Sequence, residues 1–534
     1  MPLRSPASTL PAGHRQVIVA SSLGAMFEWY DFYLYGVLAP VFAHQFFGGA
    51  GEGTAWVAAL LAFAAGFVVR PVGALLFGRL GDLIGRKYTF LVTLVLMGVA
   101  TFAIGLLPGH DAIGLAAPAL LVLLRLLQGL AIGGEYGGVA TYVAEHAPAH
   151  RRGFYTGWIQ TTASLGLLLA LLANVGLRSA LGEDAFTDWG WRLPFLASLV
   201  LLVLGIWIRI RLQESPLFLQ LKRSGGASRR PLAEAFGRWS NLRLVLLALF
   251  GLVAGQAVVW YTGHFQALFF LTLQLKVHET TAALLLGAAL LLASPLFVVF
   301  GAWSDRIGRK PIILAGCVLA ALAWLPLFDA LANAANPALV QAQQRVTVRL
   351  LAEPQDCRWH LFAPEAAGSR GCDMGKRLLS ERAVRYAQVA HSGSATLDID
   401  GVRVVIGGDE ALVAKRVDEA LDAAGYPRQA DPARIDVPRV VAILWLLIVF
   451  VAMVYGPIAA MLVEMFATRV RCSSVSLPYH VGNGWFGGFL PSAVLAVSAQ
   501  SGQFASGLWV PVAVALTSAA IGLVFLRETK GATL

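Results

Sequence analysis

Long apolar segments alternate with short polar connections along most of the chain. A helix needs about 20 mostly apolar residues to cross a bilayer. The pattern predicts twelve membrane-spanning helices, at residues 17–43, 54–77, 88–108, 117–145, 154–178, 192–212, 243–272, 281–302, 312–333, 438–463, 473–499 and 506–527. The first begins too late, runs too long and carries too many acids to be a cleaved signal peptide. We therefore expect an all-α membrane protein.

The composition of the 534-residue chain fits this expectation, because 57% of its residues are hydrophobic and only 13% are charged. Soluble globular chains are about a quarter charged, so the composition excludes an ordinary soluble enzyme, a disordered chain and a disulfide-rich secreted module. The net charge is +10. In a membrane protein this excess reflects cationic loops that face the cytoplasm. We expect no nucleic-acid partner.

The basic residues of the short connections fall on alternate sides of the predicted membrane. The connections that carry them hold Arg79, Arg86 and Lys87; Arg151 and Arg152; Lys222, Arg223, Arg229, Arg230 and Arg238; Arg306, Arg309 and Lys310; and Arg469 and Arg471. Short loops rich in Lys and Arg stay in the cytoplasm. This rule predicts a multi-pass protein of the cytoplasmic (inner) membrane with both termini in the cytoplasm.

One connection, residues 334–437, is polar and about a hundred residues long, and its place in the order of spans predicts that it is periplasmic. Alternating apolar residues around Asp400-Gly401 predict a β-hairpin, and residues 410–424 have helical periodicity. Cys357 and Cys372 lie on the oxidising side, so we expect a disulfide between them, with two free thiols as the alternative. The connection is expected to be a small α+β module between the ninth and tenth helices.

The chain also contains an internal repeat. Residues 77–87 and 300–310 share the pattern Phe-Gly-x-x-x-Asp-x-x-Gly-Arg-Lys. A weaker similarity relates the regions that follow Glu145 and Glu464. Two pseudo-symmetric six-helix bundles are therefore predicted, as in transporters whose halves rock around a central site. The expected domains are an N-terminal bundle at 1–212, a cytoplasmic interdomain loop at 213–242, the two parts of a C-terminal bundle at 243–333 and 438–534, and the insert at 334–437.

The repeated loop motif resembles the signature of the major facilitator superfamily. Other motifs resemble its metabolite:proton symporter branch: Phe27-Glu28-Trp29-Tyr30-Asp31-Phe32, Arg70-Pro71-Val72-Gly73, Arg125-Leu126-Leu127-Gln128-Gly129, Gly133-Gly134-Glu135-Tyr136-Gly137-Gly138 and Glu214-Ser215-Pro216. The resemblance covers all twelve predicted spans and leaves out the insert. It implies the twelve-helix fold of that superfamily and a carrier of a dicarboxylate, citrate, shikimate, proline or betaine.

Acidic residues within the spans are candidates for proton coupling. An ionisable group at mid-span is costly and should face a cavity or a partner. Glu28, Asp31 and Tyr35 share one helical face, and burial favours the neutral form of a carboxylate, so Asp31 can exchange a proton. The alternative is a permanent ion pair with an arginine. Glu28 is a candidate gate or coupling group, and Glu135 is either a coupling acid or part of a structural ion pair.

Buried arginines are the candidate anchors of an anionic substrate. Arg125, Gln128 and Glu135 fall on one face of the fourth span, and the guanidinium fork suits a carboxylate, either the substrate's or that of Asp31. Arg70 lies deep in the second span, where it binds substrate or, alternatively, extends to the interface.

In the second half, Gln256, Trp260 and His264 recur on one face of the seventh span. We expect them, with Tyr35, to line the substrate site. His264 is either a proton carrier or an inert hydrogen-bonded group.

The repeated loop motifs predict a cytoplasmic gate. Asp82 with Arg86, and Asp305 with Arg309, are expected to form ion pairs whose arginines also reach Glu145 and Glu464. Such pairs would hold the cytoplasmic side closed. The alternative is that these loops serve only to orient the chain in the membrane.

The sequence therefore predicts a secondary transporter that takes up a small carboxylate-bearing metabolite with protons. The alternatives are symport of a zwitterion such as betaine or proline, an exporter or antiporter, and a membrane sensor that uses the insert. The sequence holds no metal-ligand cluster, nucleotide-binding loop or nucleophile elbow, so we expect no enzyme activity, metal or cofactor. The expected partners are the substrate, protons and the lipid bilayer, and the expected state is a monomer.

Overall fold

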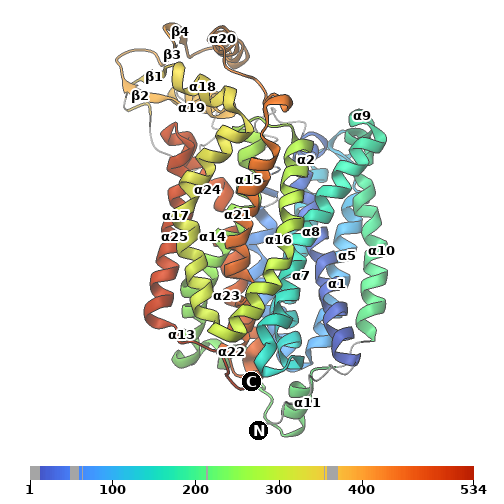
Figure 1. Ribbon diagram of the computed structural model, residues 1–534. Coiled ribbons are helices and arrows are strands. Elements are labelled where there is room, and N and C mark those ends of the chain that lie inside the picture. Colours follow the sequence, from blue (N-terminus) through green and yellow to red (C-terminus); the bar gives the residue numbers. More distant parts are fainter. Residues whose placement is uncertain are drawn as a thin grey trace.

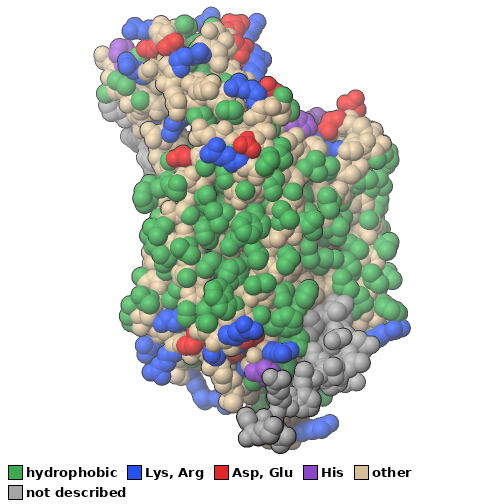
Figure 2. All heavy atoms as spheres, in the orientation of Figure 1, with side chains coloured by type: hydrophobic (Ala, Val, Ile, Leu, Met, Phe, Trp, Pro, Cys, Tyr) green, Lys and Arg blue, Asp and Glu red, His purple; other side chains and the backbone are tan. Residues whose placement is uncertain are grey.

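The computed structural model describes residues 12–47, 59, 61–62, 64–211, 214–353, 355–357 and 371–534. Long helices run side by side, and a small module of strands and helices sits on one end of them (Figure 1). The C-terminus lies at the opposite end. Figure 2 shows a wide band of hydrophobic side chains around the middle of the helices, with charged side chains gathered at both ends and on the module. This distribution is the one that a bilayer requires.

The first half of the chain contributes the helices up to residue 210. They are α1 (Ala12–Val37), α2 (Ala39–Phe47), α4 (Arg70–Leu83), α5 (Arg86–Leu106), α6 (His110–Ile113), α7 (Ala116–His146), η1 (Ala149–Arg151), α8 (Arg152–Leu181), α9 (Glu183–Ala185), η2 (Phe186–Gly190) and α10 (Arg192–Ile210). The predicted interdomain loop carries two short helices, α11 (Pro216–Arg223) and α12 (Pro231–Phe236).

The second half repeats this arrangement with more interrupted helices. Its elements are α13 (Trp239–Ala248), η3 (Leu249–Val253), α14 (Ala254–Tyr261), η4 (Thr262–Gln266), α15 (Ala267–Phe269), η5 (Phe270–Gln274), α16 (Glu279–Ile307), α17 (Arg309–Ala335), α21 (Val437–Tyr455), α22 (Ile458–Met465), η7 (Thr468–Val470), α23 (Arg471–Val481), η8 (Gly482–Gly487), α24 (Leu490–Ser501) and α25 (Phe504–Phe525). The segment from α13 to η5 is one continuous helical span with π-helical turns, which often mark functional sites.

Within the described residues, nine helical segments are long and apolar enough to cross a membrane. They are Arg86–Leu106, Ala116–His146, Ala149–Leu181, Arg192–Ile210, Trp239–Gln274, Glu279–Ile307, Arg309–Ala335, Val437–Met465 and Phe504–Phe525. The other three predicted spans differ from simple helices. Residues 17–43 divide between α1 and α2, residues 54–77 lie partly outside the described ranges, and the glycine-rich η8 interrupts residues 473–499. The total of twelve spans stays a prediction.

The loops expected to carry the repeated motifs are much shorter than predicted. Asp82 lies in the last turn of α4 and Arg86 begins α5, while Asp305 lies in α16 and Arg309 begins α17. Gly85 and Gly308 make the two tight turns, with φ of 121° and 109°. These are conformations that only glycine adopts easily. The motif side chains are therefore fixed on helix ends.

The segment between α17 and α21 forms the module. Its elements are α18 (Pro337–Arg345), β1 (Val348–Ala352), α19 (Gly371–Glu381), β2 (Ala387–Ala390), β3 (Thr396–Ile399), β4 (Val402–Val405), α20 (Glu410–Ala423) and η6 (Pro432–Arg434). The strands form one sheet in the order β2-β1-β3-β4, in which β1 and β2 are parallel and the other pairs are antiparallel. Asp400 and Gly401, both with positive φ, make the turn of the β3–β4 hairpin. A disulfide joins Cys357 to Cys372.

The two halves pack closely where small residues face each other. α8 packs against α16, and a Cβ atom added at Gly301 would lie 2.4 Å from the carbonyl oxygen of Gly153. α4 packs against α23, where a Cβ at Gly78 would lie 3.0 Å from the Cα of Ser473. Small residues at these positions let the backbones of the two halves approach closely.

Candidate functional site

At the end opposite the module, two aspartates of the repeat bind helices of the other half. The Asp82 carboxylate accepts hydrogen bonds from the backbone N–H groups of Cys472 at 3.1 Å and Ser473 at 2.9 Å, in the first turn of α23. The Asp305 carboxylate accepts the N–H groups of Gly153 and Phe154, both at 2.9 Å, in the first turn of α8. A carboxylate at a helix N-terminus satisfies free N–H groups and the positive end of the helix dipole.

The arginines of the two motifs lie against the glutamates proposed from the sequence. Arg86 is 3.7 Å from Asp82 and 3.8 Å from Glu145, and Arg471 donates to Glu145 at 2.8 Å. All four side chains are buried. The charges of this cluster therefore join α4, α5 and α7 of the first half to α23 of the second.

The second copy of the motif makes the matching cluster. Arg309 lies 2.9 Å from Asp305 and 3.1 Å from Glu464, and Arg152 of the first half lies 3.4 Å from Glu464. Both clusters thus tie one half to the other. The gating residues predicted from the repeat come together, although Arg309 and Glu464 are 155 residues apart in the chain.

Two further glutamates complete these clusters: Glu214, which the sequence analysis named in a motif without giving it a role, and Glu528, which it did not name. Glu214 accepts the backbone N–H groups of Arg86 and Lys87 at 3.1 and 3.2 Å, and Glu528 accepts those of Arg309 and Lys310 at 2.9 and 3.0 Å. Each is followed by a hydroxyl residue that reaches the cluster: Ser215 donates to Glu145, and Thr529 donates to Glu464 at 2.7 Å. A repeated Glu-Ser/Thr pair after each half was the available signal.

Inside the first half, one arginine lies within ion-pair distance of two of the predicted coupling acids. Nη2 of Arg209 on α10 lies 2.7 Å from Glu28 on α1 and 2.9 Å from Glu135 on α7, and its Nη1 donates to the carbonyl oxygen of Phe90 at 2.8 Å. Arg209 was not singled out from the sequence because it ends a predicted span, where a cation is ordinary. The geometry is that of a buried ion triad, which favours the structural ion pair for Glu135 and gives Glu28 a partner that the sequence analysis did not foresee.

Arg125 belongs to a polar chain that crosses three helices. Its Nη1 donates to Oε1 of Gln128 at 2.7 Å, and Nε2 of Gln128 donates to the hydroxyl of Thr101 on α5 at 2.8 Å. Thr101 is in turn within hydrogen-bond reach of the Asp31 carboxyl group. The arginine also stacks on the ring of Tyr35, with 4.4 Å between its Cζ and the ring centroid. Asp31 and Arg125 are thus linked through Gln128 and Thr101.

Arg70 occupies a different environment. Its Cζ lies 4.3 Å from the ring centroids of both Phe32 and Phe67, and the side chain has no exposed surface. Among the described residues, no carboxylate forms an ion pair with its guanidinium, and the Tyr261 hydroxyl is within hydrogen-bond reach of it. The alternative in which Arg70 extends to the interface is therefore not the arrangement seen. A buried cation that lacks a carboxylate partner is costly, whereas Arg209 has two such partners.

The second half supplies polar and aromatic groups near Arg70. Tyr261 on α14 and His480 on α23 both lie within electrostatic range of it, and neither was proposed from the sequence. Both ring nitrogens of His480 are buried and have no hydrogen-bond partner among the described residues. Gly484, one turn beyond His480, packs against the Arg70 side chain, with 3.8 Å between its added Cβ and the Cβ of Arg70.

The three residues predicted on the seventh span have defined partners. Gln256 exchanges two hydrogen bonds with Asn483, at 3.1 and 3.2 Å. Nδ1 of His264 donates to the carbonyl oxygen of Trp260 at 2.9 Å, and its Nε2 lies 3.0 Å from the hydroxyl of Ser164 in the first half. Trp260 stacks between His264 and Tyr33. This wall is aromatic, and His264 is fully hydrogen-bonded, which favours its inert role.

Asp31 is 4% exposed, and its Oδ1 has no hydrogen-bond partner among the described residues. Trp260 Nε1 is likewise buried without an acceptor there. Asp31 thus keeps an unpaired carboxylate oxygen inside the first half, and the unpaired imidazole of His480 in the second half lies within electrostatic range of Arg70 in the first. Within the described ranges, no three His, Cys, Asp or Glu side chains are grouped so that they could hold a metal ion.

Comparison with known proteins identifies the family. Residues 17–241 match the family model described as "Sugar (and other) transporter". The alpha-ketoglutarate permease of Escherichia coli (strain K12) is 38% identical over 322 residues, which are 60% of this chain and 72% of that protein. The chain belongs to the major facilitator superfamily, in its metabolite:proton symporter branch. It is a multi-pass membrane protein.

Other relatives are named as transporters of different compounds. The glycine betaine/proline/ectoine/pipecolic acid transporter OusA of Dickeya dadantii (strain 3937) is 37% identical over 59% of this chain, and the chain spans 64% of its length. The shikimate transporter of Escherichia coli (strain K12) is 36% identical over 59% of this chain and 72% of that protein.

Solved structures share the superfamily fold. The proton:xylose symporter XylE, bound to 6-bromo-6-deoxy-D-glucose, matches with a TM-score of 0.63 and 15% identity over 98% of both chains. A partially occluded inward-open form of XylE from E. coli matches with a TM-score of 0.60 and 15% identity, over 98% of this chain and all of that one. At this identity the likeness concerns the fold alone.

Proposed function

We propose that the protein takes up a small carboxylate-bearing metabolite together with protons, by alternating access between its two six-helix halves. The observation that carries this proposal is Arg70, a buried guanidinium that forms no ion pair with a carboxylate among the described residues. An arginine at the centre of a membrane helix costs about 2.5–3.5 kcal/mol on insertion scales. A carboxylate ligand offers the bidentate acceptor that would offset this cost.

The same region supplies a proton acceptor. Asp31 is buried, and the chain Thr101–Gln128–Arg125 leads from its carboxyl group to a cation. Glu28 and Glu135 both have Arg209 as a cationic partner, whereas Asp31 forms no ion pair among the described residues. Asp31 is therefore our choice for the coupling acid. Its neutralisation by a proton would weaken its competition with the substrate for nearby cations.

The two charge clusters around Glu145 and Glu464 act in this proposal as the cytoplasmic gate. They join the halves at the end of the bundle that carries the C-terminus, which the positive-inside rule assigns to the cytoplasm. The substrate would then enter from the side of the module, which we assign to the periplasm. Opening towards the cytoplasm requires that both clusters separate.

A zwitterion is the second candidate substrate. Aromatic rings lie around Arg70, including Trp29, Phe32 and Phe67, and Tyr33, next to Phe32, stacks on Trp260 of the second half. Aromatic faces bind ammonium groups, so a betaine could place its carboxylate at Arg70 and its cation against a ring. Either substrate uses the same arginine.

Uptake by proteoliposomes tests the proposal. The purified protein is reconstituted, an inward proton gradient is imposed, and labelled alpha-ketoglutarate, shikimate, proline and glycine betaine are offered in turn. We expect at least one to accumulate above its external concentration and to be lost when a protonophore is added. Accumulation that is insensitive to the protonophore contradicts proton coupling. Accumulation of the zwitterions alone selects the second candidate.

A further inference from the structure

A pocket lies between the module and the helices of the second half, and neither Asp31, Arg70 nor Arg125 lines it. It has a volume of about 340 Å³ and is lined by residues from η5, α17, α18, α24, α25 and the segment 380–386 of the module. Every lining residue lies between positions 270 and 508, so the first half contributes none. A site formed within one half is not on a path between the halves.

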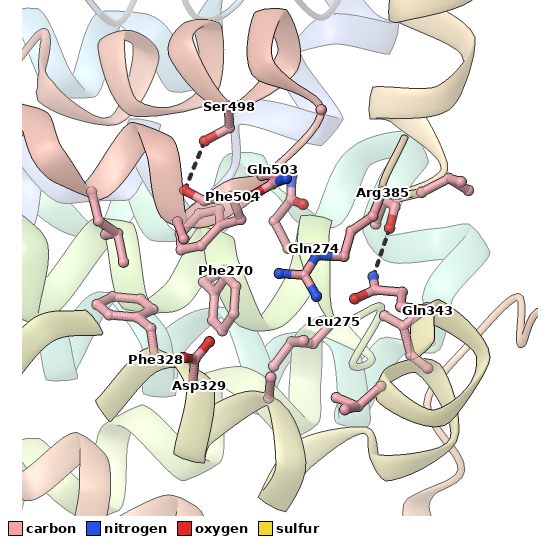
Figure 3. Close-up of a pocket in the computed structure, with 18 of the residues that line it drawn as sticks. Phe270, Gln274, Leu275, Phe328, Asp329, Gln343, Arg385, Ser498, Gln503 and Phe504 are labelled. Atoms are coloured by element: carbon pink, nitrogen blue, oxygen red, sulfur yellow. Dashed lines mark hydrogen bonds between the residues drawn. The ribbon is translucent and has the colours of Figure 1, made fainter. Parts of the chain in front are cut away.

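Two opposite charges project into this pocket without meeting. Figure 3 shows the Arg385 guanidinium reaching in from the module and the Asp329 carboxylate pointing in from α17. Neither side chain has a hydrogen bond or an ion pair with another described residue. Amide side chains of Gln274 and Gln503 surround them. The pocket therefore presents a cation and an anion to one small volume.

The floor of the pocket is aromatic. Phe270, Phe328 and Phe504 form a mutually packed trio with ring centroids 4.3 to 5.6 Å apart. Phe270 and Phe328 are 5% and 2% exposed. The faces of such rings carry partial negative charge and attract organic cations. Beside Asp329, this floor favours an ammonium group at the lower end of the pocket.

Hydrogen bonds on both sides of Arg385 hold this segment of the module against the helices, while the Arg385 side chain is exposed. The next residue, Tyr386, donates its hydroxyl to the carbonyl oxygen of Ala499 and its backbone N–H to that of Gly502 at 3.3 Å. Ala383 has a φ of 56°, which is unusual for a residue with a side chain, and its carbonyl accepts a hydrogen bond from Gln343 at 3.0 Å (Figure 3). Such strain persists only where the surroundings impose it.

We propose that this pocket is a second binding site for a zwitterion, with the ligand's anionic group at Arg385 and its ammonium group between Asp329 and the ring of Phe270 or Phe504. This chemistry occurs in soluble betaines and amino acids and in the headgroups of zwitterionic phospholipids. Because the site joins the module to α17 and α24, a bound ligand would strengthen the docking of the module. The proposal is independent of the transported substrate.

The test uses the full-length protein in a sugar-based detergent and two kinds of probe. The soluble probes are glycine betaine and glycerophosphoethanolamine, whose binding is read from the thermal melting shift. The lipid probes are phosphatidylethanolamine and phosphatidylglycerol, whose retention is read by native mass spectrometry. The pocket variants are Arg385→Gln and Asp329→Asn. The matched controls are Arg416→Gln and Glu419→Gln, which change exposed charges on α20.

We expect a zwitterionic probe to bind each pocket variant about tenfold more weakly than wild type, because each variant loses one charge-assisted contact. The control variants should bind the probe as tightly as wild type does. A soluble probe should still bind in Arg70→Gln, which separates this pocket from the interior site. Retention of phosphatidylethanolamine alone would identify the source as lipid, and a shift with the soluble probes would identify a free zwitterion. Equal binding by wild type and both pocket variants, or preference for phosphatidylglycerol, contradicts the proposal.

Discussion

Asp82 and Asp305 make equivalent contacts, because each binds the N-terminus of a helix in the other half of the protein. Asp82, from the first half, accepts N–H groups in the first turn of α23 in the second half, and Asp305, from the second half, accepts N–H groups in the first turn of α8 in the first. Each half thus caps a helix of the other. The closed end of the bundle depends on both contacts, because the two sets of helices must separate together.

This reciprocity predicts that loss of either aspartate opens the same interface. Asp82→Asn or Asp305→Asn replaces an acceptor oxygen by a donor and should remove about 1–3 kcal/mol from the closed state. Cys472 is a free, buried thiol in the Asp82 contact and reports opening. In a Cys317→Ser background, maleimide labelling of Cys472 should rise several-fold in both variants and stay unchanged in Asp111→Asn, which alters an exposed residue. Labelling that rises only in Asp82→Asn would mean a local effect.

Arg209 should be essential for stability. It lies 2.7 Å from Glu28 and 2.9 Å from Glu135, and Arg209→Gln leaves two buried carboxylates without a cation. Breaking a buried pair costs about 3–5 kcal/mol, so the variant should melt well below wild type in detergent. Arg211→Gln, two residues further on and exposed, is the control and should melt like wild type. Equal melting of the two variants would exclude the triad.

Arg70 should behave in the opposite way, although it is just as buried. Because it forms no ion pair with a carboxylate among the described residues, Arg70→Gln removes an uncompensated charge and should not lower the melting temperature of the substrate-free protein. It should abolish the melting shift caused by a transported substrate. A strong loss of stability in Arg70→Gln would indicate an internal partner and would remove this residue from the binding site.

The disulfide between Cys357 and Cys372 tests on which side of the membrane the module lies. Disulfides persist in oxidising compartments and are rare in the cytoplasm. Mass spectrometry after alkylation without reductant should find these two cysteines joined, and Cys357→Ser should lower the stability of the module by about 3 kcal/mol, the value expected for a loop of this length. Alkylation of both thiols in protein taken directly from cells would contradict a periplasmic module.

The sequence predicted contacts that depend on spacing along one helix or on the internal repeat. Spacing along the fourth span indicated that Arg125 and Gln128 share a face, and they are hydrogen-bonded. The repeat indicated that Arg309 and Glu464 belong together, and they form an ion pair. The hairpin around Asp400-Gly401 followed from local alternation and turn chemistry.

Contacts between helices that are distant in the sequence could not be predicted in this way. Arg209 at the end of a span looks like any cation near the interface, and only the packing of α10 against α1 and α7 reveals its two acids. His480 stands in a segment broken by glycines, where periodicity gives no face to compare with Arg70. Whether a buried arginine has a carboxylate partner also depends on the tertiary structure. The sequence therefore could not distinguish Arg70 from Arg209.

The central claim is that Asp31 exchanges the coupling proton beside a substrate bound by Arg70. The most direct test is to measure, in proteoliposomes, proton-driven accumulation and substrate exchange for Asp31→Asn, with Asp111→Asn as the matched control. We predict that Asp111→Asn retains both activities, whereas Asp31→Asn loses accumulation and retains exchange. Accumulation by Asp31→Asn to the wild-type level would contradict the account.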